Sequence, residues 1–180
     1  IKEEKDIIMI PDPGYASYKE MVKVSGGLAY SVPLTAENNY MPDMEEVLAN
    51  LVKEGLNPKK IKALVVNYPN NPLGATATKE YLESIVKFCK KYDILLMSDA
   101  AYSDMYFKEE LKPISIFQIE GAKDIAVEFF SFSKPYAMTG WRLGWICGNK
   151  EAIKFFDGDE KRFGGMYDCV AQACDYCAHG

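Results

Sequence analysis

The chain has 180 residues, of which 48% are hydrophobic, and this composition favours a globular protein with a buried core over a disordered one. Its net charge is −5 and no basic stripe runs along it, so nucleic-acid binding is disfavoured. No apolar run is long enough to cross a bilayer, and we expect a cytoplasmic protein without a membrane segment. We expect residues 1–180 to form a single domain. Because the chain opens at Ile1 without an initiating Met, we expect it to belong to a longer protein.

Short apolar runs alternate with amphipathic segments along the chain, which is typical of an α/β fold with a mostly parallel sheet flanked by helices. Asp43 and Thr78 precede two of the helical segments and are expected N-caps. In chain order, we expect a strand over 6–10, a helix over 17–25, a strand over 28–32, a helix over 44–52, a strand over 61–66, a helix over 79–92, and strands over 94–97, 125–130 and 143–147. The direction of the last strand stays open, with an antiparallel placement as one option.

Three polar residues follow the carboxyl ends of expected strands. Asn71 comes after the strand over 61–66, Asp99 just after the strand over 94–97, and Lys134 after the strand over 125–130. In open α/β sheets the ligand crevice lies at this edge. The sequence therefore predicts that these distant residues meet at one site.

Lys134 follows Ser131 and Ser133 and precedes Arg142 by eight positions. A lysine amine can form a Schiff base with an aldehyde, and the planar fork of an arginine can hold two phosphate oxygens. Pyridoxal phosphate (PLP) carries both an aldehyde and a phosphate, so the segment predicts a PLP site in which the Ser131 hydroxyl adds a phosphate donor. The plainer alternatives are a surface lysine and an arginine paired with a carboxylate.

Four further residues fit the same cofactor. Asp99 can hold the proton on the pyridine nitrogen, and this lets the ring accept electrons from a substrate carbanion. Tyr102 and Asn71 can both hydrogen-bond the phenolic oxygen of the ring, and Tyr15 can stack on the ring. The alternatives are a helix N-cap for Asp99, a plain turn around Asn71 and a core or interface role for Tyr15.

Residues 6 to about 153 resemble the class I and II aminotransferases of PLP fold type I. The lysine motif from Ser131 to Gly144 is highly specific, and residues 99–103 and 121–124 look most like LL-diaminopimelate aminotransferases. The other matching segments are Asp12-Pro13-Gly14-Tyr15, Pro33-Leu34, Tyr68-Pro69-Asn70-Asn71-Pro72-Leu73-Gly74 and Ser98-Asp99.

This resemblance implies the large, PLP-binding domain of a transaminase, with Lys134, Asp99 and Tyr102 as the catalytic residues. Lys134 would bind PLP as a Schiff base and then move a proton from the substrate α-carbon to the cofactor. The amino group would pass from an amino acid to a 2-oxo acid such as 2-oxoglutarate. The resemblance also implies a homodimer with its active site at the subunit interface.

The chain departs from the family pattern in several places. We expect the family's N-terminal segment with its phosphate-binding helix to be missing from residues 1–180, together with the small C-terminal domain, whose arginine grips the substrate carboxylate. Arg162 does not match that arginine, and Leu73 stands where Thr is usual. After Ala152 the match decays. The isolated chain is therefore expected to bind a substrate carboxylate poorly.

Two other functions use the same fold. A PLP-dependent carbon–sulfur lyase would release ammonia, whereas a regulator would use an aminotransferase-like domain as a non-catalytic PLP sensor. The complete set of Lys134, Asp99, Tyr102, Asn71 and Arg142 favours catalysis over sensing.

A cysteine cluster lies close to the end of the chain, at Cys169, Cys174 and Cys177, with His179 beside it. Such a spacing could hold a metal, but a fourth thiolate is missing nearby. The favoured interpretation is a helix over 170–178 that places two small apolar residues on one face, and we expect no metal.

Overall fold

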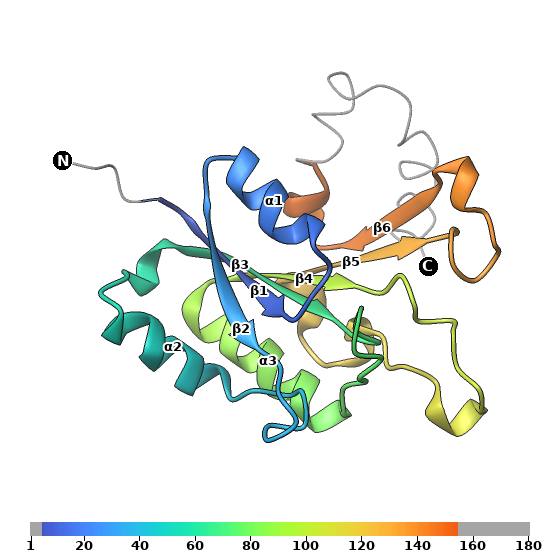
Figure 1. Ribbon diagram of the computed structural model, residues 1–180, viewed down its shortest axis with the longest axis horizontal. Helices are drawn as coiled ribbons and strands as arrows, with labels where there is room; N and C mark the ends of the chain where they lie inside the picture. The colour runs from blue at the N-terminus through green and yellow to red at the C-terminus, as the bar shows by residue number, and fades with distance from the viewer. Residues whose placement is uncertain (1–4, 155–180) are drawn as a thin grey trace.

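The computed structural model describes residues 5–154, which form a six-stranded sheet in the order β2-β1-β3-β4-β5-β6 (Figure 1). The first five strands in this order are parallel, and β6 runs antiparallel to β5. This confirms the mostly parallel α/β sheet and settles the direction of the last strand. The strands are β1 (Ile7–Asp12), β2 (Leu28–Pro33), β3 (Ile61–Asn67), β4 (Leu95–Asp99), β5 (Ala126–Ser131) and β6 (Gly144–Gly148).

The three expected α-helices are present, and both expected side-chain caps form. Asp43 accepts a hydrogen bond from the backbone N–H of Glu45, and Thr78 accepts one from that of Tyr81. The α-helices are α1 (Ser17–Val24), α2 (Met44–Lys53) and α3 (Lys79–Tyr92). Short 3-10 turns cover Pro58–Lys60, Glu109–Leu111, Ile116–Gln118, Ala122–Asp124 and Thr139–Trp141.

The strand order explains why the helices lie on both faces of the sheet. Right-handed crossovers that run in opposite directions along a sheet place their helices on opposite faces. The step from β1 to β2 runs one way, whereas the steps from β2 to β3 and from β3 to β4 run the other way. Accordingly, α1 lies on one face, and α2 and α3 lie together on the other (Figure 1).

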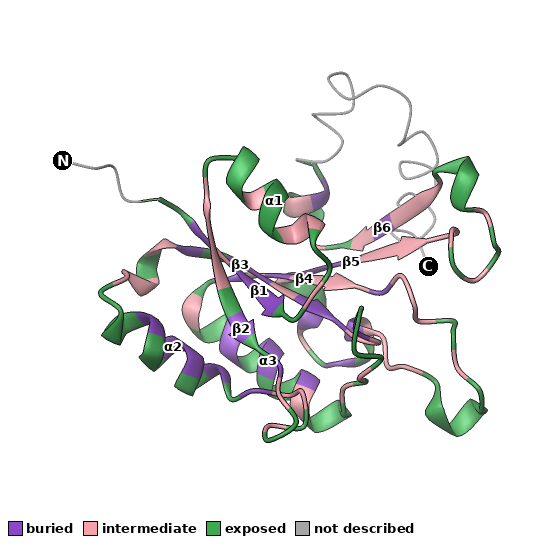
Figure 2. Cartoon of the chain, in the orientation of Figure 1, coloured by how far each residue is buried: buried purple, intermediate pink, exposed green. Residues whose placement is uncertain are grey.

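The hydrophobic core fills the space between the sheet and the pair α2 and α3 (Figure 2). Leu51 of α2 and Ile85 of α3 are fully buried there, as is Leu96 of the central strand β4. By contrast, α1 has no buried residue and leaves Met21 and Val24 exposed. The face that carries α1 is therefore only thinly covered by the described residues.

One boundary differs from the sequence prediction in a way that affects the site. Asp99 was expected just beyond its strand, but it is the last residue of β4 and pairs in register with Asn67 of β3. Among the smaller differences, β1 continues to Asp12, two residues beyond its predicted end, and α1 ends at Val24, one residue before its predicted end.

A long connection without an α-helix joins β4 to β5, and one buried carboxylate fastens it to the sheet. Glu128 of β5 is 1% exposed and accepts three hydrogen bonds. They come from the Ser98 hydroxyl (3.0 Å), the Ser115 hydroxyl (2.5 Å) and the backbone N–H of Ile116 (3.0 Å). These bonds satisfy a polar group that would otherwise be costly to bury.

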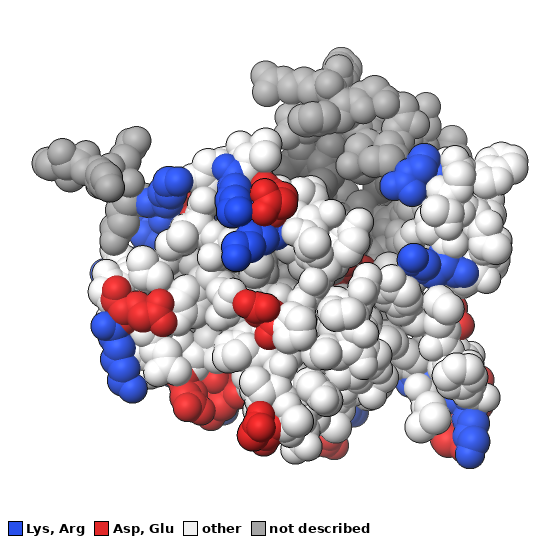
Figure 3. Space-filling view, in the orientation of Figure 1, with Lys and Arg blue, Asp and Glu red and all other residues white. Residues whose placement is uncertain are grey.

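Charged side chains of both signs are scattered over the face of the molecule shown in Figure 3. Within residues 5–154, no helix combines the length and apolar character needed to cross a bilayer. The same residues contain no cluster of three or more His, Cys, Asp or Glu side chains that could hold a metal ion. The predicted helix over 170–178 and its cysteines lie outside the described residues.

Candidate active site

The carboxyl ends of three adjacent strands bring the predicted site residues to one edge of the sheet. Asp99 closes β4, Asn71 lies four residues beyond β3, and Lys134 lies three residues beyond β5. Because β4 lies between β3 and β5, the residue that ends β4 is flanked by the loops that carry the other two. This is the edge where open α/β sheets bind ligands.

A cavity of about 630 Å³ opens at this edge, and Asn71, Tyr102 and Lys134 all line it. Its volume lies in the range of small-molecule sites. The Asn71 amide donates to the Tyr102 hydroxyl at 3.2 Å, and Lys134 Nζ stands 5.4 Å from the centre of the Tyr102 ring. The two side chains predicted to share one ligand oxygen are thus in contact, with the amine beside them.

The Asp99 carboxylate accepts two hydrogen bonds from protein donors. The backbone N–H of Ala101 donates to Oδ1 at 3.1 Å, and the hydroxyl of Tyr18 donates to Oδ2. The first bond closes a turn of the type that aspartate favours after a strand, and no α-helix follows for Asp99 to cap. The second bond comes from α1, the helix of the crossover that joins β1 to β2.

Burial, followed by the negative charge of Asp99 and the hydrogen bond to it, raises the pKa of Tyr18 far above its usual value. Tyr18 therefore keeps its proton throughout the pH range in which proteins work, and it acts as the donor in this pair. Sequence reasoning missed this residue. Its only signal is that it lies in the first turn of a helix that follows a strand of the sheet.

Asn67 is a second residue that sequence reasoning missed as part of the site. Its side chain is 2% exposed and joins two of the predicted residues through their backbones. Nδ2 donates to the Asp99 carbonyl oxygen at 2.9 Å, and Oδ1 accepts from the Asn71 N–H at 2.8 Å. One amide thus fixes the end of β4 relative to the loop that follows β3.

Tyr15 lies outside the lining of the cavity and is 50% exposed. Its ring meets the Tyr18 ring edge-on at 5.7 Å, so it lies on the same side of the site as the donor to Asp99. The turn before it requires glycine, because a Cβ on Gly14 would lie 2.3 Å from the Pro11 carbonyl oxygen.

The two predicted phosphate ligands, Ser131 and Arg142, also lie outside the lining of the cavity. Ser131 Oγ accepts from the Ser133 N–H at 3.2 Å and so shapes the turn that leads to Lys134. Arg142 is exposed, has a left-handed backbone with φ 54°, and donates from Nη1 to the Thr139 carbonyl oxygen at 3.2 Å.

Residues 1–173 match the family model described as aminotransferase class I and II. The chain is 50% identical over 152 residues to LL-diaminopimelate aminotransferase 2 of a Nostoc species, which covers 84% of this chain and 37% of the relative. It is 42% identical over 168 residues to the LL-diaminopimelate aminotransferase of Aquifex aeolicus, with 91% and 42% covered.

Solved structures give the same result. Apo-BacF from Bacillus subtilis matches with a TM-score of 0.80 and 32% identity, over 99% of this chain and 44% of that one. An aspartate aminotransferase of Thermus thermophilus, solved with maleate, matches with a TM-score of 0.75 and 32% identity, over 92% and 41%. The chain thus spans well under half the length of these relatives. With both its sequence and its fold matched along almost its whole length, the chain belongs to the class I and II aminotransferases.

Proposed function

We propose that the protein is a PLP-dependent aminotransferase that moves an amino group from an amino acid, with LL-diaminopimelate as the first candidate, to a 2-oxo acid such as 2-oxoglutarate. The observation that carries the proposal is the cavity in which the Lys134 amine faces the hydrogen-bonded pair Asn71 and Tyr102, at the edge of the sheet where Asp99 ends β4 without lining the cavity itself. Family membership and the names of the relatives support the choice of reaction and donor.

The residues present suit PLP. The cofactor offers an aldehyde, a phenolic oxygen, a ring nitrogen and a phosphate, and this edge of the sheet offers an amine, a paired hydroxyl and amide, and a carboxylate. Asn70 Nδ2, which is buried and has no hydrogen-bond partner among the described residues, borders the same cavity as a further donor. Bound there, PLP would supply the electron sink that makes the substrate α-proton removable.

Each side chain then has a distinct task. Lys134 would hold the cofactor through Nζ, and its amine would serve as the base that takes the substrate α-proton. Asp99 holds the proton at the ring nitrogen, while Tyr102 and Asn71 hold the phenolic oxygen through hydrogen bonds.

Three more residues hold the cofactor in place. Ser131 and Arg142 bind the phosphate, and the fork of Arg142 suits two phosphate oxygens at once. In the structure Arg142 Nη1 donates to the Thr139 carbonyl oxygen, and this contact would have to give way to the phosphate. Tyr15, whose ring is half exposed beside Tyr18, covers the pyridine ring.

The first test is to add PLP to the full-length protein, reduce it with borohydride and map the modified peptide. We expect a visible absorption band and a reduced adduct on Lys134. The Lys134→Ala variant should lose both, whereas Lys87→Ala, on the exposed face of α3, should keep both. A wild-type protein without the band, or an adduct at another lysine, would refute the PLP assignment.

The second test offers LL-diaminopimelate, glutamate, aspartate and alanine as amino donors, with 2-oxoglutarate as acceptor. An aminotransferase yields a 2-oxo acid and no free ammonia, whereas a carbon–sulfur lyase acting on a sulfur amino acid yields pyruvate and ammonia. Release of ammonia in place of amino transfer would assign the lyase reaction.

The assembly and the location are part of the same proposal. We expect a homodimer in the cytoplasm, with residues 1–180 contributing to one PLP-binding domain. Sedimentation equilibrium of the full-length protein measures the assembly directly, and a monomer that transaminates at full rate would contradict it.

A further inference from the structure

The hydrogen bond from Tyr18 to Asp99 joins two residues that are 81 positions apart in the sequence. Tyr18 lies in the first turn of α1, and Asp99 ends β4, which is not a neighbour of the strand that leads into α1. Together with the Ala101 N–H, the Tyr18 hydroxyl gives each oxygen of the carboxylate its own donor. Two donors on two different elements hold the plane of a carboxylate in one orientation, which a single donor does not do.

We propose that Tyr18 is a positioning residue that orients the Asp99 carboxylate toward the ring nitrogen of PLP. The inference rests on the proposed function, because it requires PLP to bind beside Asp99. A carboxylate that is already oriented loses little conformational freedom when the cofactor binds, whereas one that rotates freely must be ordered at that moment. Tyr18 thus acts on the cofactor through Asp99.

The state of the Tyr18 proton agrees with this role. Burial and the adjacent carboxylate raise the pKa of Tyr18, so the hydroxyl does not ionise near neutral pH and the donor is not lost. The titratable side chains that interact with it are Asp99, Tyr102 and Tyr15, all of which belong to the predicted site.

A purely structural role is the alternative. Because α1 buries no residue of its own, the Tyr18 hydroxyl could serve only to fasten this helix to the sheet. Its loss would then lower the free energy of unfolding but leave the affinity for PLP and the spectrum of the bound cofactor unchanged.

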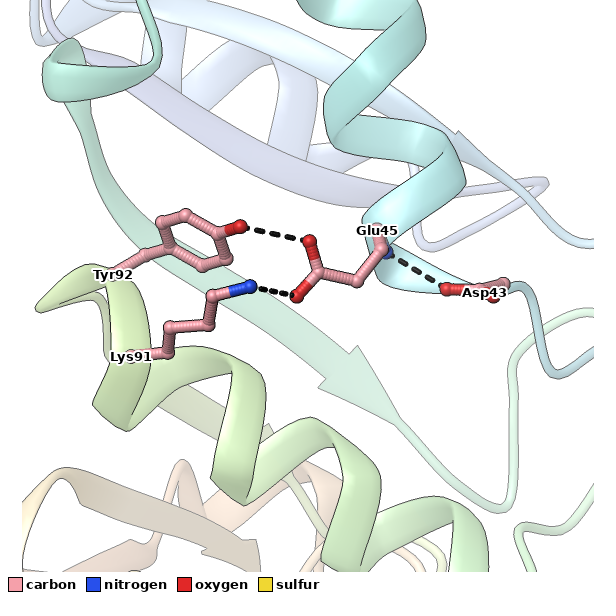
Figure 4. Close-up of polar contacts among 4 residues, drawn as sticks. All are labelled: Asp43, Glu45, Lys91 and Tyr92. Carbon is pink, nitrogen blue, oxygen red and sulfur yellow. Dashed lines mark hydrogen bonds and ion pairs between the residues drawn. The ribbon is translucent and has the colours of Figure 1, made fainter.

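The test compares Tyr18→Phe with Tyr92→Phe in the full-length protein. Tyr92 is a matched control because its hydroxyl also bonds a carboxylate, Glu45 Oε2 at 2.7 Å, but between α2 and α3 and away from the site (Figure 4). Both changes remove one hydroxyl and keep the ring. PLP affinity is measured by fluorescence titration, and the pH midpoint of the visible absorption band by spectroscopy.

We expect Tyr18→Phe to weaken PLP binding by about tenfold and Tyr92→Phe to change it by less than about twofold. We also expect the pH midpoint of the band to rise by about half a unit in Tyr18→Phe only. The reason is that a rotating Asp99 keeps the ring nitrogen protonated less well, and the ring then withdraws less charge. Circular dichroism and the melting temperature establish that both variants are folded.

A double-mutant cycle decides whether the effect passes through Asp99. In an Asp99→Ala background, the further change Tyr18→Phe should alter PLP affinity by less than about twofold, because the group that Tyr18 orients is gone. An undiminished tenfold effect in that background would overturn the inference, as would a Tyr18→Phe variant with wild-type affinity and midpoint. If wild-type protein binds PLP but Tyr18→Phe does not show the expected effects, the proposed function stands without the positioning role. If wild-type protein binds no PLP, both fall.

Discussion

The Asn67 side chain offers a sharp test of how the site is held together, and Asn67→Ala is the perturbation. The substitution removes two hydrogen bonds, of 2.9 Å and 2.8 Å, from a side chain that is 2% exposed. It leaves the Asp99 carbonyl and the Asn71 N–H without their partner in a part-buried environment. Each such loss is worth about 1–3 kcal/mol, since an unsatisfied buried group has given up water without compensation.

We therefore expect Asn67→Ala to lower the free energy of unfolding by about 2–6 kcal/mol, which is a large share of the 5–15 kcal/mol typical of a domain. Urea unfolding followed by circular dichroism measures this change. The matched control is Asn50→Ala, on the exposed face of α2, where the effect should stay within about 0.5 kcal/mol.

The two variants should also differ in PLP binding. Asn67→Ala should weaken it, because Asn71 and Asp99 lose their common tether, whereas Asn50→Ala should leave it unchanged. The reasoning is refuted if Asn67→Ala is as stable as Asn50→Ala, because the two buried backbone groups would then have found other partners.

Three further predictions concern the rest of the fold. Leu51→Ala removes a fully buried side chain from the core and should lower the free energy of unfolding, measured in urea, by about 3–5 kcal/mol. Val52→Ala, at a half-exposed position of the same helix, should lower it by under about 1 kcal/mol. Equal losses of stability would contradict the assigned faces of α2. Burial raises the pKa of the Cys89 thiol to about 12, so iodoacetamide at neutral pH should label this thiol only after the protein unfolds. Mass spectrometry maps the labelled cysteine, and rapid labelling of Cys89 in the native protein would contradict the prediction. The hydrogen bonds from Lys91 and Tyr92 lower the pKa of the Glu45 carboxyl below its unfolded value of 4.5. These contacts therefore stabilise the fold fully above pH 4.5, and the stabilisation is lost as the pH falls through the pKa of the folded state. In Glu45→Gln the melting temperature should therefore depend less on pH on the acid side.

The alternation of apolar runs and amphipathic segments was sufficient to predict the sheet and its three α-helices, since local spacing determines which face each element buries. The caps at Asp43 and Thr78 are equally local, and both formed as expected. The end of β4 was not predictable in this way. Ser98 and Asp99 look like the start of a loop, but pairing with β3 extends the strand through them.

The contacts of Tyr18 and Asn67 escaped prediction for a different reason. Tyr18 bonds a residue 81 positions away, and Asn67 bonds one 32 positions away, so no periodicity or motif spacing encodes either pairing. The sequence motifs predict which side chains carry the chemistry. The side chains that orient them become visible only once the strands lie in register.

The Glu128 anchor divides the long connection between β4 and β5 into two parts that differ in their tolerance of change. The part near Ser115 and Ile116 is tied to a buried carboxyl group, so an insertion there would deprive that group of two of its three donors. The part that carries Met105, Phe107 and Leu111 is exposed, and Met105 and Phe107 also line the cavity. Length changes at exposed loop segments disturb a fold little. Residues 105–111 are therefore the stretch in which an evolving lineage can reshape the wall of the cavity while the sheet beneath stays the same.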